Sequence, residues 1–425
     1  MKLINKTWIV VASFCLAGVA CAQSAVTLTD SSTGLTLVQA MRLALQRYPA
    51  VHATRFQLAS AGSDVTKAEG ARWPVLSVGA AAMQSGVNST YAQSLTPQLT
   101  YSAYAGGGVE AGVERAQHLK SAAARKLDST QDDVAYQAGE AYLQWARAFD
   151  QLALARKNLQ SVKQIKNDVE TIVEVDKGRM VDLNQAQVRV KAAALIVSQR
   201  EAEVAQAKAH LSRYVDMVPK SAGGLDGLQA KSPPSLELAL AALEEQHPVL
   251  EQMRAQVRAA KSAITIAQAQ IRPKVDLSVA RQINPYTLTT FTTSQVNLNM
   301  PVFNGGIGQA GVQGAVEQLQ AAQSSLDEQV LVSQEKVSSA WSEWRMAQDR
   351  SSLSADQAEA GLQLVDNYKL QFKLARRSLL DLLNVQNETY GYQAAAIQAG
   401  FDVRLAQLKL TSAMGRLVRV IQELP

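Results

Sequence analysis

Cysteine is nearly absent from this 425-residue chain, and its two cysteines, Cys15 and Cys21, both lie close to the N-terminus. A framework of disulfide bonds is therefore excluded for the rest of the chain. Aromatic residues are also scarce, at 5% of the sequence, whereas Ala, Gln, Leu, Ser and Val are abundant. This composition favours long helices over an ordinary mixed core.

A strong excess of charge of either sign is missing as well. The chain has 42 Lys and Arg against 37 Asp and Glu, a net charge of +5. Residues 1–22 contain Lys2 and Lys6 and no acidic residue, so without them the balance is 40 − 37 = +3. This near balance removes the main electrostatic argument for a nucleic-acid partner, and none is expected.

Long apolar runs are confined to the N-terminus. Lys2 and Lys6, the apolar residues 8–20 and the sequence Ala20-Cys21-Ala22 have the order of a secretory signal peptide, predicted over residues 1–22. An alternative is that Cys21 is lipidated, because residues 18–21 loosely resemble a lipoprotein cleavage site. No later segment has the roughly 20 apolar residues of a transmembrane helix, so any membrane-spanning part must be β-structure.

Proline spacing shows that the chain is duplicated. Pro49 and Pro248, like Pro74 and Pro273, are 199 residues apart, and the same shift aligns many other positions without a gap. It pairs Tyr104-Ala105-Gly106-Gly107 with Phe303-Asn304-Gly305-Gly306, Trp145 with Trp344, and Asp182-Leu183 with Asp381-Leu382. We therefore predict a first repeat over residues 23–218, a linker over 219–235 and a second repeat over 236–425.

Each repeat changes from helical periodicity to a period of two and back. Alternating apolar residues predict strands at residues 75–84 and 97–106 and, in the second repeat, at 274–283 and 294–303. Loops rich in Thr, Ser and Asn are expected between them. Long helices are predicted over residues 108–217 and 307–420, since none of the eleven prolines lies within these two regions.

The predicted strands have one apolar and one polar or small face. In a transmembrane barrel the apolar face contacts lipid, and the side chains expected there are Leu76, Val78, Leu277, Leu298 and Met300. Four strands cannot close a barrel, because the smallest use about eight. Three chains would supply twelve strands, with the long helices forming an α-helical barrel beneath. An ordinary small sheet packed on helices is the alternative.

The strand-to-helix segment Pro301-Val302-Phe303-Asn304-Gly305-Gly306 resembles the corresponding junction of the TolC-like outer membrane factors. Gly106 and Gly107 occupy the matching junction of the first repeat. Residues 178–186 and 371–384 resemble the helical-hairpin tips of that family. The resemblance implies a mainly α-helical homotrimer with a twelve-stranded outer-membrane barrel continued by a periplasmic α-helical barrel. It also implies two partners, a periplasmic adaptor and an inner-membrane transporter.

The resemblance further implies a gate at the periplasmic tip. The family closes its tip with an acidic ring and with links from an aromatic residue and an arginine to an aspartate. Carried over to this sequence, Asp381 takes the ring position, Phe372 the aromatic, Arg377 the arginine and Asp182 its partner. Asn384, one turn from Asp381, is neutral where some members have a second aspartate. Ordinary solvated charges at the tip are the alternative.

No enzyme chemistry is indicated. The four histidines lack a metal-ligand spacing, and the glycine-rich segments lack the Lys-Ser/Thr of a phosphate loop. We therefore expect no catalytic residue, metal or cofactor. The leading hypothesis is an outer-membrane exit duct for type I protein secretion, with an ABC-type transporter as partner. The alternatives are the same duct serving small-molecule efflux, and a periplasmic coiled-coil adaptor without a pore.

Overall fold

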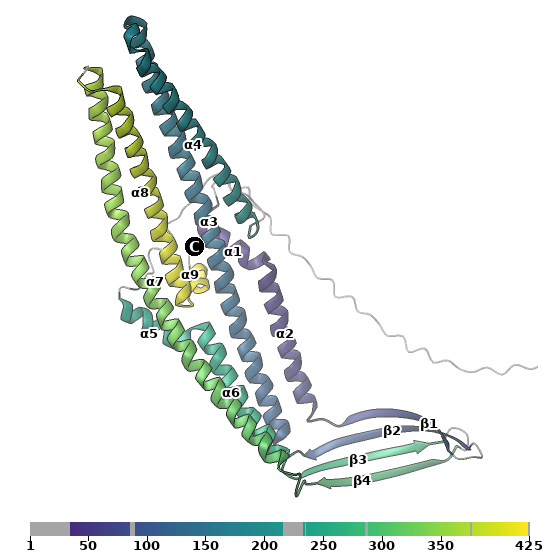
Figure 1. Cartoon of the computed structure of the whole chain (residues 1–425). Helices are drawn as coiled ribbons and strands as arrows, with labels where there is room; N and C mark the ends of the chain where they lie inside the picture. Colours follow the sequence, from purple (N-terminus) through teal and green to yellow (C-terminus); the bar gives the residue numbers. More distant parts are fainter. Residues whose placement is uncertain are drawn as a thin grey trace, which may run out of the picture.

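The computed structural model describes residues 35–85, 90–215, 233, 235–284, 288–374 and 376–423. The predicted signal peptide over residues 1–22, including Cys21, and nearly all of the predicted linker over residues 219–235 lie outside this part. Helices dominate, and one four-stranded sheet lies at the end of the molecule opposite two long helical hairpins (Figure 1).

The first repeat contains α1 (Leu37–Arg47), α2 (Pro49–Gly70), β1 (Val75–Ser85), β2 (Thr90–Tyr104), α3 (Gly108–Val175), the short 3-10 helix η1 (Lys177–Arg179) and α4 (Met180–Ser212). The second contains α5 (Leu236–Gln246), α6 (Pro248–Ala269), β3 (Lys274–Ile283), β4 (Thr290–Asn299), α7 (Ile307–Lys373) and α8 (Leu379–Ala413), followed by α9 (Leu417–Glu423). Successive elements therefore occur in the same order in both repeats.

The helix starts follow from local sequence. Thr36 begins α1 with a capping box, in which its hydroxyl and the Gln39 side chain exchange hydrogen bonds with backbone N–H groups. Both α2 and α6 have 22 residues and start at a proline, Pro49 or Pro248, whose missing N–H is not needed at that position. The 199-residue shift thus relates helices as well as sequence.

The four strands form a single antiparallel sheet in the order β1-β2-β3-β4. Each hairpin pairs within its own repeat, and β2 pairs with β3 across the two repeats. The strands β1 and β4 each have one neighbour, so both are edge strands (Figure 1). This joining of the two hairpins was not predicted.

Two predicted strands are displaced. β2 begins at Thr90 and not at residue 97, and β4 spans Thr290–Asn299 and not 294–303. Much of both predicted loops is therefore strand, because Thr, Ser and Tyr pair well in a ladder, and Pro97 lies inside β2. Pro97 lies opposite Val78, while the β2–β3 pairs pass from Leu95 directly to Gln98.

The register sorts the side chains onto two faces. Leu76 lies opposite Leu99, which lies opposite Val279, so these residues share a face. By the two-residue alternation the same face carries Val78, Leu277 and Leu298, and it would continue to Met300 just beyond β4. The other face carries Ser77, Gln98, Ser278 and Gln295. The sheet is thus apolar on one side and polar on the other.

Buried side chains form three clusters along the helices. One joins α1, α3 and α9 and contains Trp145, and a second joins α5, α7 and α8 and contains Trp344. The third lies near the hairpin ends and takes residues from α3, α4, α7 and α8. The two repeats are therefore held together both in the middle of the molecule and near its helical tip.

Candidate functional site

The tip of the α3/α4 hairpin is the turn formed by η1. Asp176 caps this turn, since its carboxylate accepts a hydrogen bond from the Gly178 N–H at 3.0 Å. Arg179 then donates to Asp182 in the first turn of α4, at 2.8 Å. A carboxylate in the first turn also interacts favourably with the helix dipole. Asp182 is thus paired within its own hairpin.

The tip of the α7/α8 hairpin is closed by a different cap. The Ser378 hydroxyl accepts a hydrogen bond from the Asp381 N–H at 3.1 Å, which places the half-buried Asp381 in the first turn of α8. Arg377 is exposed, donates to Gln371 Oε1 at 3.1 Å and lies 4.8 Å above the Tyr368 ring. Arg377 therefore contacts residues of its own hairpin.

The expected link between Arg377 and Asp182 is not formed within one chain. Among the ion pairs of the described residues, Asp182 is bound to Arg179, because that partner is three residues away on the same turn. Phe372 is only 7% exposed and packs in the tip cluster, with the Arg179 guanidinium 5.8 Å from its ring centre. Phe372 therefore contributes packing in place of a hydrogen bond.

Other polar contacts join the two hairpins. Arg189 Nη2 on α4 donates to Asn384 Oδ1 on α8 at 3.1 Å. Gln386 donates to Asn158 Oδ1 on α3 at 3.0 Å and accepts from the Ser161 hydroxyl at 3.4 Å. Of these residues only Asn384 was predicted at the tip as a gate residue. The helical periodicity of the sequence could not predict the other contacts, because it does not show which faces of α3 and α4 lie against α8.

An apolar cluster lies beneath these contacts and takes residues from all four long helices. Its nine buried members are Ile165, Val169, Val173, Leu183, Ala186, Phe372, Leu379, Leu382 and Leu383. Three of them belong to the Leu-rich segment that marked the second tip in the sequence. Packing at this cluster holds the α7/α8 hairpin against the α3/α4 hairpin.

The strand-to-helix junctions lie at the other end of the long helices. All four predicted junction glycines have φ between 64° and 85°, a region that favours glycine: Gly106, Gly107, Gly305 and Gly306. A Cβ on Gly106 would also lie 2.9 Å from the Cβ of Arg272, which lies between α6 and β3. Pro301 and Phe303 lie between β4 and α7, and Phe303 is 88% exposed.

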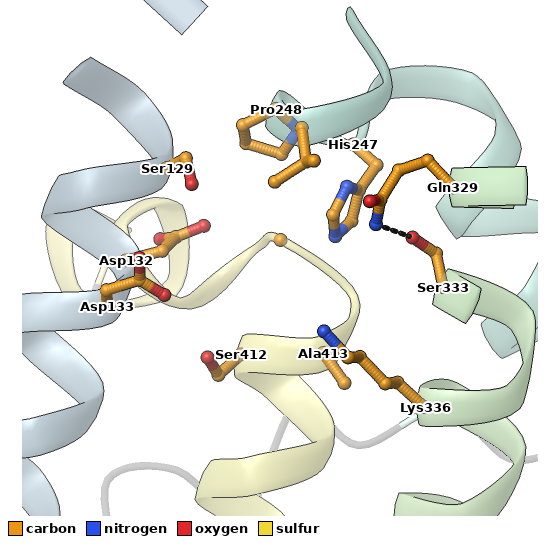
Figure 2. A pocket seen from close by; sticks show the side chains of 12 residues that line it. Ser129, Asp132, Asp133, His247, Pro248, Gln329, Ser333, Lys336, Ser412 and Ala413 are labelled. Carbon is orange, nitrogen blue, oxygen red and sulfur yellow. Dashed lines mark hydrogen bonds between the residues drawn. The ribbon is translucent and has the colours of Figure 1, made fainter. Parts of the chain in front are cut away.

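Midway along the molecule, a cavity of about 160 Å³ lies between α3, α6, α7 and the end of α8. Figure 2 shows its polar lining, with Asp132 and Asp133 on one side and His247, Gln329 and Lys336 on the other. The lining also includes Ser129, Ser333 and Ser412. No feature of the sequence singled out this site.

Two groups in the cavity have shifted pKa values because they are buried. Asp132 is 6% exposed, and burial raises its pKa to about 7, although its Oδ1 accepts a hydrogen bond from the Val418 N–H at 2.8 Å. Burial lowers the pKa of His247 to about 4. Its Nδ1 has no hydrogen-bond partner within the described ranges. Both groups are therefore uncharged in the folded chain between about pH 4 and 7.

None of the described helices is both long enough and apolar enough to cross a membrane. In the same part of the chain, no group of three or more His, Cys, Asp or Glu residues is arranged to hold a metal ion.

Comparison with known proteins gives consistent matches. A model of the outer membrane efflux protein family matches residues 40–215 and 239–416. The chain is 26% identical to the outer membrane efflux protein BepC of Brucella suis biovar 1, over 68% of this chain and 65% of BepC. It is 22% identical to protein CyaE of Bordetella pertussis, over 92% of this chain and 86% of CyaE. The structure of the outer-membrane channel OprN superimposes with a TM-score of 0.76 and 20% identity, covering 89% of each chain.

These matches confirm the predicted family resemblance, the duplicated and mainly helical fold class, and the outer-membrane location. They also confirm the expectation that this is not an enzyme, since the matched proteins are channels and efflux proteins. The two segments matched by the family model correspond to the two repeats and include both tips. The chain belongs to the outer membrane efflux protein family.

Proposed function

We propose that this chain forms the outer-membrane exit duct of a tripartite exporter, completed by a periplasmic adaptor and an inner-membrane transporter. The observation that carries the proposal is the separation of the sheet from the tips (Figure 1). With 68 residues at 1.5 Å each, α3 is about 100 Å long. A helical tube of that length would cross a periplasmic space from an anchored sheet.

The open edges of the sheet support a homotrimer. β1 and β4 each leave one row of backbone N–H and C=O groups without a partner strand in the chain. In lipid such an edge is untenable, because each unsatisfied group costs several kcal/mol. Joining β4 of one copy to β1 of the next would pair both edges. Three copies would close twelve strands.

The register supports the proposed lipid-facing side. Leu76, Val78 and Leu298 share one face, and each is more than 60% exposed in the single chain. Leu277 and Met300 belong to the same face and are less exposed. An arginine near mid-bilayer on this face should cost about 2–4 kcal/mol, whereas Ser77 or Asn297 on the other face should accept it with a change mainly in pore properties.

The tip contacts support a gate, in a form that differs from the predicted latch. The α7/α8 hairpin is tied to the α3/α4 hairpin by Arg189–Asn384 and by Gln386–Asn158. A net hydrogen bond contributes about 0.5–1.5 kcal/mol, so six such contacts in a trimer would hold the tip shut yet yield to a bound adaptor. Three copies of Asp381 would provide the acidic ring, and Asp381→Asn should weaken block by multivalent cations.

The exported molecule is proposed from two different observations. The Leu379-Leu380-Asp381-Leu382-Leu383 tip is closer to type I protein-secretion members, which favours a protein substrate and an ABC-type transporter. The similarity to a protein named as an efflux protein favours small molecules as the second candidate. The two candidates share the duct and differ in the transporter that it serves.

A deletion strain complemented with the chain tests both candidates. Loss of a secreted protein from the medium on deletion, restored by the intact gene, supports type I secretion. Increased sensitivity to several unrelated small toxic compounds, with an unchanged set of secreted proteins, supports efflux. A purified folded protein of monomeric mass in detergent would contradict the exit duct itself.

A further inference from the structure

The duplication gives the chain two equivalent helix joints. At each joint, the C-terminal end of the shorter helix of a hairpin, α4 or α8, contacts the start of α2 or α6. At the first joint, the end of α4 (Arg213 and Tyr214) meets Tyr48, which precedes α2. At the second joint, the end of α8 meets His247, which precedes α6. Under the 199-residue shift, Tyr48, Arg213 and Tyr214 of the first joint correspond to His247, Ser412 and Ala413 of the second.

The first joint is filled by large side chains. The Tyr48 and Tyr214 rings are stacked with their centres 5.2 Å apart, and His210 packs edge-on against Tyr214 at 5.8 Å. Arg213 lies over both tyrosine rings and donates to the Tyr48 hydroxyl at 2.7 Å. The Tyr214 hydroxyl donates to Gln137 on α3 at 3.4 Å. The end of α4 is therefore fastened to α2 and to α3.

The second joint is hollow. Small side chains, Ser412 and Ala413, replace the arginine and tyrosine, and the 160 Å³ cavity lies beside them (Figure 2). The backbones still approach closely, since a Cβ on Gly415 would lie 2.5 Å from the Pro248 Cδ. The joint is thus held by this close contact and by buried apolar side chains such as Leu250, Leu410 and Met414, with open space next to it.

We propose that the second joint, whose cavity is lined by the buried Asp132 and His247, is a yielding pivot for the α7/α8 hairpin, whereas the first joint is rigid. Its functional meaning rests on the proposed gate, because a hairpin that opens at its tip must bend or turn near its base. The base of α8 is this joint, and its hollow side leaves room for that movement.

Asp132 connects the pivot to the C-terminus. Its carboxyl group accepts the Val418 N–H near the start of α9, and Arg42 on α1 donates to the Ile421 carbonyl near the end of α9, at 2.8 Å. Opening the second joint would move the segment after Gly415 and disturb the Asp132–Val418 bond. The amides of α9 therefore report on the joint.

Charged groups face the two buried side chains from several elements. Asp132 is near Asp128 and Asp133 on its own helix and near Arg419 on α9. His247 hydrogen-bonds the Ala413 backbone on α8, and Lys336 faces it from α7. Lys336 disfavours a charged imidazole, and the neighbouring aspartates disfavour a charged Asp132. The Val418 and Ala413 hydrogen bonds and Arg419 act the other way, so burial is the dominant cause that keeps both groups neutral.

Opening the joint to water would then move protons in opposite directions. Asp132, neutral in the closed joint up to about pH 7, would release a proton because its ordinary pKa is 3.8. His247, neutral in the closed joint down to about pH 4, would take up a proton at any pH below its ordinary 6.5. Between about pH 4.5 and 6.5 the two exchanges cancel, so the closed joint should be insensitive to pH.

Hydrogen exchange of the full-length assembled protein, corrected for intrinsic amide rates, tests the pivot. Amides of residues 410–421 should exchange faster than those of residues 48–52 and 211–215 at the first joint. Between pH 4.5 and 6.5 the opening constant of the second joint should change by less than about threefold. Equal protection at the two joints would overturn the proposal.

Two single substitutions remove one proton exchange each. In Asp132→Asn the large proton exchange that remains is that of His247, so the opening constant should fall with rising pH between 4.5 and 6.5, by up to about tenfold for each pH unit. In His247→Gln only Asp132 remains, and the constant should rise about tenfold for each unit. Slopes that match the unmodified protein, or slopes of the same sign, would overturn the proposal.

Two further measurements, an NMR titration of His247 and the conductance of the assembled protein, complete the test. Should either variant fail to assemble, titration of the His247 imidazole carbon resonance in the unmodified protein replaces it. A neutral imidazole at pH 5.5 supports the proposal, and an ordinary titration midpoint overturns it. The pivot and the gate also fail separately, because opposite pH slopes can be present while Arg189→Ala leaves the conductance unchanged.

Discussion

The two helix joints of this protein have nearly the same backbone and very different contents. Tyr48 and His247 both precede a proline and have φ of −70°, with ψ of 128° and 124°. Yet stacked aromatic rings fill the first joint, and the second encloses a polar cavity. The duplication preserved the path of the chain, and the side chains decide which repeat is fastened and which is free to move.

The same contrast extends to the regions around the joints. The first joint lies beside a large apolar cluster that includes Tyr214, Leu211 and Trp145. The second lies beside a smaller apolar cluster that includes Leu410 and Met414, and its cavity is lined by buried polar groups, namely Asp132, His247 and Ser333. Because an apolar cluster is stabilised by burial and a neutralised polar cavity is not, the two regions should respond differently to the same kind of change.

The largest difference should come from truncating equivalent residues. Tyr214→Ala removes a stacked ring and an arginine contact, and should lower the free energy of unfolding by about 3–5 kcal/mol. At the equivalent position, Ala413→Gly should cost only about 1 kcal/mol, the helix-propensity difference. Denaturant unfolding at fixed protein concentration measures both. Equal losses would mean that the first joint is no better packed than the second.

Changing the buried acid should affect stability in a pH-dependent way. The pKa of Asp132 is raised, so its contribution to stability is full below about pH 3.8 and is lost as the pH rises to about 7. Asp132→Asn removes that loss and should be more stable than the unmodified protein at pH 8, by an amount on the order of 2–4 kcal/mol. The advantage should vanish near pH 4.

His247→Gln is the matched control for this experiment and should show the opposite trend. The pKa of His247 is lowered, so stability is lost as the pH falls from 6.5 towards 4, and the glutamine variant gains at the acid end. Thermal unfolding at pH 4, 6 and 8 measures both variants. A gain by both at the same pH would show that the two groups do not oppose one another.

The close approach at the second joint can be tested with one added carbon atom. Gly415 has φ of 64°, and a Cβ there would lie 2.5 Å from Pro248, so Gly415→Ala should cost about 1–3 kcal/mol. Gly391→Ala is the control, since a Cβ at Gly391 in α8 meets no atom within 4 Å, and it should be neutral or stabilising by up to about 1 kcal/mol. Similar losses for both variants would remove the evidence for a tight backbone contact.

Filling the second joint should make it resemble the first. Ala413→Tyr places at the second joint the residue type found at Tyr214, next to the cavity. Cavity filling commonly adds about 0.5–2 kcal/mol of stability. The substitution should also slow hydrogen exchange of residues 410–421. Faster exchange would show that the cavity does not accept the ring.

Much of the fold could be predicted from the sequence because the duplication shows each periodic pattern twice. Each apolar position of one hairpin is supported by its partner 199 residues away, which gave β1 and β3 nearly to the residue. The pairing of β2 with β3 could not be predicted, because no local pattern shows which strand edges meet. Thr90 and Phe291 lie in segments whose composition is typical of loops, and only their pairing makes them strands.

The site was predicted only where a residue's role depends on its neighbours in sequence. The four junction glycines are such local features, whereas the cap that Ser378 provides to Asp381 was not predicted. The contact between Arg189 and Asn384 spans 195 residues, and the Asp132–Val418 bond spans 286. Such contacts depend on which faces of long helices meet, and a helical period leaves that open. The expected partner of Arg377 was therefore replaced by one in its own hairpin.

The central claim, a pore that the tip contacts hold shut, is tested most directly by single-channel conductance of the purified protein in a planar bilayer. The unmodified protein should show small, mostly closed channels, and Arg189→Ala should raise the ratio of open to closed channels by at least about tenfold, because it removes three contacts of about 0.5–1.5 kcal/mol each from the trimer. Arg156→Ala is the control, because Arg156 pairs with Glu201 within the α3/α4 hairpin, and it should leave the conductance unchanged. The absence of channels, or equal effects of both substitutions, would contradict the account.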